Sequence, residues 1–188
     1  MAQAPLRDRI EPGVRVLFVG INPGLRSAAT GHHFAGYSNR FWKLLYESGL
    51  VDEPITYEQD DRLPQWGFGI TNIVPRATAG IDELSPEDYR RGAAALLRKV
   101  RQYKPQVVAL VGVTVWRALL EALGETARRR QPVTLGYQTL TIEGARVCVL
   151  PNPSGRNATL TYQQMLTAFR SLTGANAPAR HLLRPLSR

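Results

Sequence analysis

Short apolar runs alternate with amphipathic stretches along most of the chain. Four runs rich in apolar and β-branched residues predict buried strands, at 14–20, 68–74, 106–112 and 147–150. The segment 137–142 predicts a further strand at the edge of the sheet. The first and the last buried runs each lead into an Asn-Pro sequence, which is typical of a strand that enters a loop.

Amphipathic segments between these runs predict helices. Ser38 can cap a helix that ends at Gly49, and Thr114 can cap one that ends at Gly124. A last helix is expected near 160–172. Strands that alternate with helices indicate an α/β protein, and we expect a three-layer α/β/α sandwich around a mainly parallel central sheet.

The longest predicted helix begins with a Ser-Pro-Glu-Asp sequence. Ser85 can cap this helix, Pro86 suits the first turn, and Asp88 can reach back to the cap residue. We expect the helix to continue to Tyr103. This capping role is the plain structural interpretation of Asp88, and it competes with a chemical role considered below.

The chain is expected to form one domain. No break in composition divides it, so we expect this domain at 1–174, followed by a basic C-terminal tail at 175–188 that can be disordered.

The predicted sheet brings two loops to one place. Ligands of such sheets bind beyond the carboxyl ends of the strands. The Asn-Pro sequences at Asn22 and Asn152 should therefore face the same crevice.

Composition excludes several classes of protein. The 24 Lys and Arg against 15 Asp and Glu leave a net charge of +9, which fits a polyanionic partner and fits an ordinary basic surface equally well. The apolar runs are shorter than the roughly 20 residues that cross a bilayer, and the N-terminus lacks an apolar signal core. We therefore expect a cytoplasmic protein with no membrane partner. Cys148 is the single cysteine, which excludes an internal disulfide and a four-cysteine metal site.

Candidate chemistry is concentrated in loops. Asn22 offers an amide at the mouth of a strand, where it can hold a water molecule but is a poor base, although Asn-Pro is also an ordinary turn sequence. Phe34 lies among small and polar residues and suits stacking on a planar base. His32 and His33 lack further ligands that would complete a metal site. The loop at 151–157 carries amides, a hydroxyl and an arginine able to enter DNA.

Three kinds of protein remain open at this point. A nucleotide-binding α/β enzyme is disfavoured, because the sequence Gly-Ile-Asn-Pro-Gly at 20–24 lacks the Lys and Ser or Thr of a phosphate-binding loop. A glycosylase that excises a base from DNA and a non-catalytic module that binds damaged DNA both fit the amides, the loop aromatic ring and the positive charge.

Taken together, the motifs resemble the mismatch-specific uracil and thymine DNA glycosylase family, within the uracil-DNA glycosylase superfamily. The resemblance runs from about Arg15 to Leu172 and includes, in the family's order, VLFVGINPGLRSAATGHHFAGYSNRFWKLLYESGL, GITNIVPRAT, KPQVVALVG and VLPNPSG. It implies a monofunctional hydrolase that needs no metal or redox cofactor. Such an enzyme flips uracil out of double-stranded DNA containing G·U or related mispairs, and it leaves an abasic site. We expect it to act as a monomer.

The resemblance also implies roles for individual residues. Asn22 is similar to the residue that positions the attacking water, and Phe34 to the ring on which the extruded pyrimidine stacks. Ile21 and Ser27 are similar to pocket residues around that base. The loop that enters the DNA helix and contacts the mismatched strand is matched by Asn152, Pro153, Ser154 and Gly155. An asparagine at the catalytic position predicts slow turnover, because it orients water without removing a proton.

Some positions depart from the family's pattern or leave its chemistry open. Arg156 stands where the family usually has an apolar wedge, and Asn157 follows it. A guanidinium can fill the gap by stacking or bond the orphaned guanine, so the opposite-base preference stays open. Position 72 is Asn, which leaves the choice among uracil, thymine and ethenocytosine open. Asp88 is the first candidate for a carboxylate that assists Asn22, since its helix start could border the crevice.

Overall fold

One five-stranded sheet organises the molecule, and the strand order is β2-β1-β3-β5-β4. The computed structural model describes residues 6–125 and 132–176. The strands are β1 Val16–Gly20, β2 Phe68–Asn72, β3 Val107–Val111, β4 Gly136–Ile142 and β5 Ala145–Leu150. Neighbouring strands pair in parallel, except that β4 pairs antiparallel with β5 at the edge.

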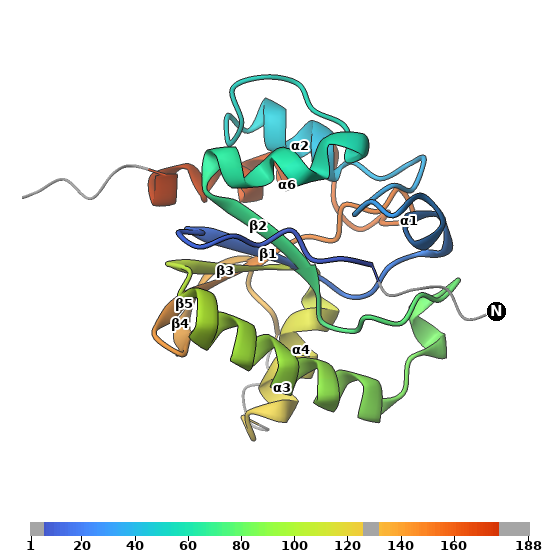
Figure 1. The fold of residues 1–188 in the computed structure, drawn as a ribbon, viewed down its shortest axis with the longest axis vertical. Helices are drawn as coiled ribbons and strands as arrows, with labels where there is room; N and C mark the ends of the chain where they lie inside the picture. The colour runs from blue at the N-terminus through green and yellow to red at the C-terminus, as the bar shows by residue number, and fades with distance from the viewer. Residues whose placement is uncertain (1–5, 126–131, 177–188) are drawn as a thin grey trace, which may run out of the picture.

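Helices cover both faces of this sheet. Helices α2 and α6 lie over one face, and α3 and α4 cover the other (Figure 1). The α-helices are α1 Leu25–Thr30, α2 Phe41–Glu47, α3 Pro86–Tyr103, α4 Val113–Ala122 and α6 Tyr162–Arg170. The 3-10 helices are η1 Tyr57–Trp66, η2 Ile81–Glu83 and η3 Thr173–Asn176. The predicted α/β/α sandwich with a mainly parallel sheet is thereby confirmed. The predicted tail at 175–188 falls almost entirely outside the described residues.

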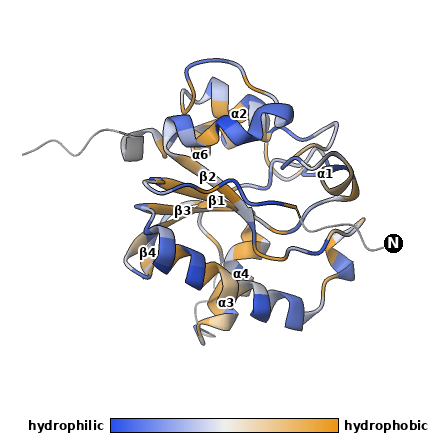
Figure 2. Cartoon of the chain, in the orientation of Figure 1, coloured by the Kyte–Doolittle hydropathy of each residue, from blue (hydrophilic) through white to orange (hydrophobic). Residues whose placement is uncertain are grey.

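The core has two parts, one on each face of the sheet. Val16 and Phe18 of β1 belong to the cluster beneath α2 and α6, whereas Leu17 and Val19 belong to the cluster beneath α3 and α4. All four are completely buried, and burial of each side chain stabilises the fold by about 1.5–3 kcal/mol. Figure 2 shows hydrophobic strands in the middle of the molecule, with many hydrophilic residues along α2, α3 and α6. Among the described residues, no helix is both long and apolar enough to span a bilayer.

The start of α3 follows the prediction. Ser85 Oγ accepts a hydrogen bond from the Asp88 N–H at 3.1 Å, and Asp88 Oδ2 accepts one from the Ser85 N–H at 2.9 Å. This reciprocal pair satisfies two backbone donors that the first helical turn would otherwise leave unbonded. The helix then ends at Tyr103, as predicted.

The predicted caps of α2 and α4 are wrong. Helix α2 begins after Arg40, and Asn39 Oδ1 accepts a hydrogen bond from the Phe41 N–H at 3.0 Å. Ser38 instead lies against a glycine of the loop that follows β5. Helix α4 begins after Gly112, whose φ of +121° lets β3 pass directly into the helix without a Thr114 cap.

Gly92 allows α3 to approach the chain that leaves β2. A Cβ atom at Gly92 would lie 2.0 Å from the carbonyl oxygen of Ile73, which is shorter than any non-bonded contact. We predict that Gly92→Ala destabilises the protein by about 1–3 kcal/mol, as overpacking does, although alanine is the better helix former by about 1 kcal/mol. Urea unfolding measures this free energy. The reverse substitution at an exposed position of the same helix, Ala94→Gly, serves as the control. It should lower the free energy of unfolding by only about 1 kcal/mol, the difference in helix propensity. A stabilised Gly92→Ala variant would contradict the close approach.

Candidate functional site

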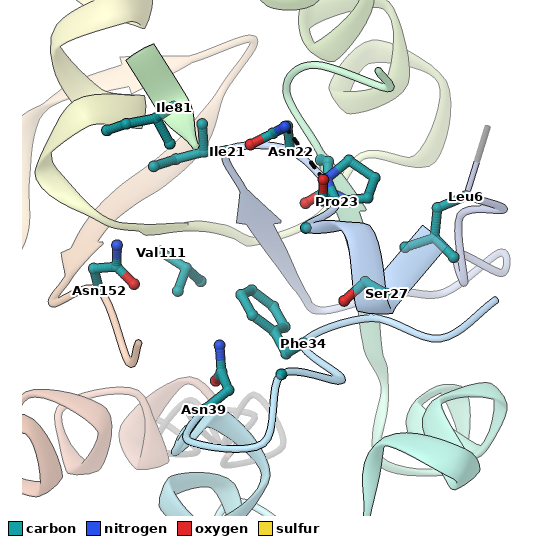
Figure 3. Close-up of a pocket in the computed structure, with 13 residues that line it drawn as sticks. Leu6, Ile21, Asn22, Pro23, Ser27, Phe34, Asn39, Ile81, Val111 and Asn152 are labelled. Carbon is teal, nitrogen blue, oxygen red and sulfur yellow. Dashed lines mark hydrogen bonds between the residues drawn. The ribbon is translucent and has the colours of Figure 1, made fainter. Parts of the chain in front are cut away.

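The carboxyl ends of four parallel strands border one pocket of about 180 Å³. Ile21 and Asn22 follow β1, Asn72 ends β2, Val111 ends β3, and Asn152 follows β5. Figure 3 shows Asn22 and Asn152 on opposite sides of Val111, so both Asn-Pro sequences face one crevice as predicted. The residues predicted to contact water or base all line this pocket, namely Ile21, Asn22, Ser27, Phe34 and Asn152.

Phe34 forms a wall of the pocket and is fixed to the core behind it. Its ring stacks on that of Phe41, with centroids 4.3 Å apart and 20° between the planes. The backbone φ of Phe34 is +51°, a left-handed conformation that residues other than glycine rarely adopt. Ser27 fixes the residue after Phe34, because Ser27 Oγ accepts a hydrogen bond from the Ala35 N–H at 3.1 Å.

Gly20 lets the Phe34 ring and the Asn72 amide lie close against strand β1. A Cβ atom at Gly20 would lie 2.5 Å from Asn72 Oδ1 and 3.2 Å from Phe34 Cζ. A larger residue at this position would displace one or both of these groups. The glycine therefore lets an aromatic ring and an amide oxygen lie next to each other in the pocket. This arrangement suits a planar ligand with polar atoms on its edge, such as a nucleobase.

The Asn22 amide has a fixed orientation. Its Nδ2 donates hydrogen bonds to the Pro23 carbonyl at 3.2 Å, the Arg76 carbonyl at 3.0 Å and Thr78 Oγ1 at 2.7 Å. Thr78 Oγ1 in turn donates to the Gly80 carbonyl at 2.7 Å, so its lone pair is available to accept. Because carbonyl oxygens only accept hydrogen bonds, the amide nitrogen must face these partners. The oxygen takes no part in these bonds and is left to accept a hydrogen bond from water.

The loop after β5 is attached to the start of α2. Arg40 donates from Nη2 to the Ser154 carbonyl at 2.9 Å, and its backbone N–H donates to the Pro153 carbonyl at 3.0 Å. A Cβ atom at Gly155 would lie 2.4 Å from the Ser38 side chain, so only glycine allows this approach. The loop is therefore fixed beside the pocket before any ligand arrives.

A groove of about 420 Å³ continues from the pocket along this loop. It shares Asn22, Ile81 and Asn152 with the pocket, and Arg156 and Asn157 lie along it. Arg156 is exposed. The predicted DNA-contacting residues thus lie next to the predicted base-contacting residues.

Asp88 is not brought to this pocket. Its Oδ2 accepts hydrogen bonds from Arg76 Nη2 at 2.8 Å and from the Ser85 backbone at 2.9 Å. The Arg76 guanidinium, followed by the Ser85 bonds, lowers the pKa of Asp88 to about 2. Asp88 reaches Asn22 only indirectly, through the Arg76 residue whose carbonyl accepts from the amide. The structure shows the capping interpretation, and direct assistance to Asn22 stays a prediction.

Sequence reasoning missed some residues of the site. Thr78 binds Asn22 across a separation of 56 positions, and no local pattern reveals such a pair. His33 was considered only as a metal ligand, yet its buried ring lies beside Asn72. Within 6–125 and 132–176, no group of three His, Cys, Asp or Glu side chains is placed to hold a metal ion.

Two comparisons with known proteins concern the family and the fold of this chain. Residues 8–173 match the family model described as the uracil DNA glycosylase superfamily. The chain is also similar to a solution NMR structure from Methanosarcina acetivorans that carries a provisional assignment as a uracil DNA glycosylase. The identity is 16%, the TM-score is 0.55, and the match covers 92% of this chain and 99% of that one. At this identity the likeness supports a shared fold alone.

The ion pair of Asp88 predicts a pH-dependent stability. The pKa of this carboxyl is lower in the folded state than its usual value of 3.8, so its contribution is present above that value and is lost as the pH falls towards 2. Asp88→Asn keeps an oxygen that can accept from Ser85 but removes the charge that binds Arg76. We expect wild type to exceed Asp88→Asn in free energy of unfolding at pH 7, and the difference to decrease below pH 3.8 and to disappear as the pH falls through about 2. Urea unfolding across this range measures it, and a pH-independent difference would refute the assignment.

Proposed function

The chain belongs to the uracil DNA glycosylase superfamily, and we propose that it is the mismatch-specific type, a monofunctional enzyme that removes uracil from mispairs with guanine. Membership of the superfamily supports a hydrolytic DNA glycosylase of base excision repair. The observation that carries the proposal is the convergence of the Asn22 amide, the Phe34 ring and the loop at Asn152 on one pocket. We further propose that it acts as a monomer on chromosomal DNA in the cytoplasm.

The pocket suits a base that has left the duplex. A base inside the stack is inaccessible, so the nucleotide must rotate outwards, which requires a few kcal/mol and least at a mispair. Stacking of the everted base on Phe34 stabilises the flipped state by about 1–3 kcal/mol. The balance favours G·U and G·T over A·U.

Asn22 carries the catalytic step of the proposed reaction. Its oxygen accepts a hydrogen bond from a water molecule and directs the water oxygen at C1′ of the deoxyribose. The bond from C1′ to the base nitrogen breaks, its electron pair leaves with the base, and the attacking water loses a proton to solvent. The amide orients the water without taking that proton, so this step remains slow. Backbone N–H groups of the surrounding loops can stabilise the negative charge that develops on the base.

Arg156 contacts the strand opposite the lesion in this proposal. Eversion of uracil leaves a guanine without a partner, and a guanidinium can bond two acceptors of guanine at once or fill the gap by stacking. Arg156 is exposed beside the pocket, and Pro153, Ser154, Gly155 and Asn157 place it there. The net charge of +9 adds attraction for the phosphate backbone.

A non-catalytic module for damaged DNA is the second candidate. The amide chemistry of the pocket would serve recognition as well as hydrolysis, because Asn22 is a weak catalyst. Incubation with a G·U duplex followed by alkali separates the two, since an abasic site breaks under alkali. Strand cleavage at the uracil supports the enzyme, whereas binding without cleavage supports the module.

Substitutions at the Asn22 contacts test the catalytic proposal. We expect Asn22→Ala to slow single-turnover release of uracil by at least about 100-fold, the lower end of what a positioned catalytic group contributes. Thr78→Val removes one acceptor of the Asn22 amide and should slow release about tenfold, while Thr78→Ser keeps the hydroxyl and should retain activity. Asp88→Ala should also retain activity. A loss with Asp88→Ala as large as that with Asn22→Ala would assign the carboxylate a role in the reaction, either directly or through Arg76.

Arg156 should govern the preference for the opposite base. We expect Arg156→Ala to slow uracil release from G·U about tenfold, consistent with the loss of one bidentate contact, and to affect A·U much less. Arg156→Lys keeps the charge without the planar pair of donors and serves as the control. Equal losses on G·U and A·U would assign Arg156 to phosphate contact instead.

A further inference from the structure

His33 is a buried histidine that contacts the pocket from behind. Its side chain is 1% exposed, and its two ring nitrogens have different partners. Nε2 lies 3.1 Å from the Arg7 carbonyl oxygen, and Nδ1 lies 3.4 Å from Asn72 Nδ2. The Trp42 indole N–H also donates to the His33 backbone carbonyl at 3.1 Å, so the backbone that carries the ring is held as well.

The Arg7 carbonyl determines which nitrogen of His33 carries the proton. A carbonyl oxygen accepts hydrogen bonds and never donates them, so Nε2 must be protonated. In a neutral ring Nδ1 is then an acceptor, and it takes a hydrogen bond from the Asn72 amide. Burial lowers the pKa of His33, against the opposing effects of the Arg7 carbonyl and the Asp60 and Asp8 carboxylates. The ring is therefore neutral near pH 7.

The tautomer of His33 in turn orients Asn72. Because Asn72 Nδ2 faces His33, its Oδ1 points away from that ring and lies near Gly20, and both Asn72 and Phe34 line the pocket. The edge of a base stacked on Phe34 would meet this oxygen. Uracil and thymine carry an N–H donor at N3, whereas cytosine has only a lone pair there and would leave the amide oxygen unbonded.

We propose that His33 is a positioning residue, which sets the Asn72 amide so that the pocket accepts bases with an N–H donor and disfavours cytosine. This inference depends on the proposed function and adds to it a basis for substrate choice. It also predicts that protonation of His33 reverses the amide. A charged ring would donate from Nδ1, the Asn72 oxygen would turn to accept, and the amide nitrogen would face the base.

The charged groups around His33 come from two segments. Asp8 and Arg9 lie on the N-terminal segment, and Asp60 of η1 accepts the His33 backbone N–H at 2.9 Å. The Arg9 guanidinium and the His32 ring both contact Asp60, at 3.0 and 3.1 Å. The carboxylates favour a charged His33 ring, while burial and Arg9 oppose it.

Binding measurements with His33→Gln test the proposal. Glutamine can still donate to the Arg7 carbonyl but offers no acceptor at the position of Nδ1. Duplexes would carry 2′-fluorinated uracil or cytosine nucleotides, which resist cleavage, opposite the same abasic spacer, so that pairing does not differ. We expect wild type to prefer uracil, and His33→Gln to lower the ratio of the two Kd values about tenfold, as for one lost hydrogen bond.

Two controls separate positioning from a general structural effect. In a variant that already carries Asn72→Ala, His33→Gln should leave the ratio of the two Kd values unchanged, because no amide remains to be oriented. A general disturbance of the pocket by His33→Gln would change the ratio in that background too. As the pH falls below 6.5, the usual pKa of histidine, the preference of wild type should decrease once His33 takes up a proton, and that of His33→Gln should not change. An unchanged ratio in the single variant, or the same decrease in both backgrounds, would overturn the proposal.

The tautomer itself is measurable without DNA. Nitrogen-15 NMR of the free wild-type protein should show His33 neutral near pH 7 with its proton on Nε2. A proton on Nδ1 would overturn the proposal whatever the activity. If the protein neither bound nor cleaved uracil-containing DNA, the proposed function would fail, and the NMR result would still decide the orientation of the pair.

Discussion

Parallel pairing of β1 with β2 and β3 fixes the site, because it brings the carboxyl ends of strands that are far apart in sequence to one edge of the sheet. Asn22 and Asn72 are 50 positions apart along the chain, and yet the register pairs Gly20 with Asn72 directly. Complete burial of β1 on both faces holds that register, since a slip by one residue would move Phe18 to the wrong core. The pocket is thus a consequence of hydrophobic packing several residues away from it.

Polar groups within the fold complete what packing begins. Asp60 is fully buried and accepts hydrogen bonds from the Arg9 side chain, the His32 ring and the His33 backbone. A buried carboxylate is tolerated only when it is paired and bonded in this way. Through these contacts the N-terminal segment and η1 together anchor the loop that carries Phe34. The loop therefore has a defined position although it contains little regular structure.

The sequence predicted the features that depend on local periodicity or on local hydrogen bonds. The buried strands and the Ser85 cap belong to this class, because neighbouring residues decide them. The assignments to Ser38 and Thr114 were wrong for a tertiary reason, since Ser38 packs against Gly155 and Gly112 joins β3 to α4 without a polar cap. The bonds of Asn22 to Thr78 and of His33 to Asn72 join separate loops. Periodicity carries no information about such pairs.

The stacking of Phe34 on Phe41 has a thermodynamic consequence for ligand capture. Phe41 is itself enclosed by Phe18, Trp42 and Phe169 at centroid distances of 5.1–6.0 Å, so the core holds the Phe34 ring in place. The left-handed backbone of Phe34 is strained, and this strain is balanced during folding. A ring that binds here therefore stacks on a preorganised surface. The Phe34 side chain loses little conformational entropy on binding, because it is already ordered. Selectivity can then depend on which polar atoms face the ring.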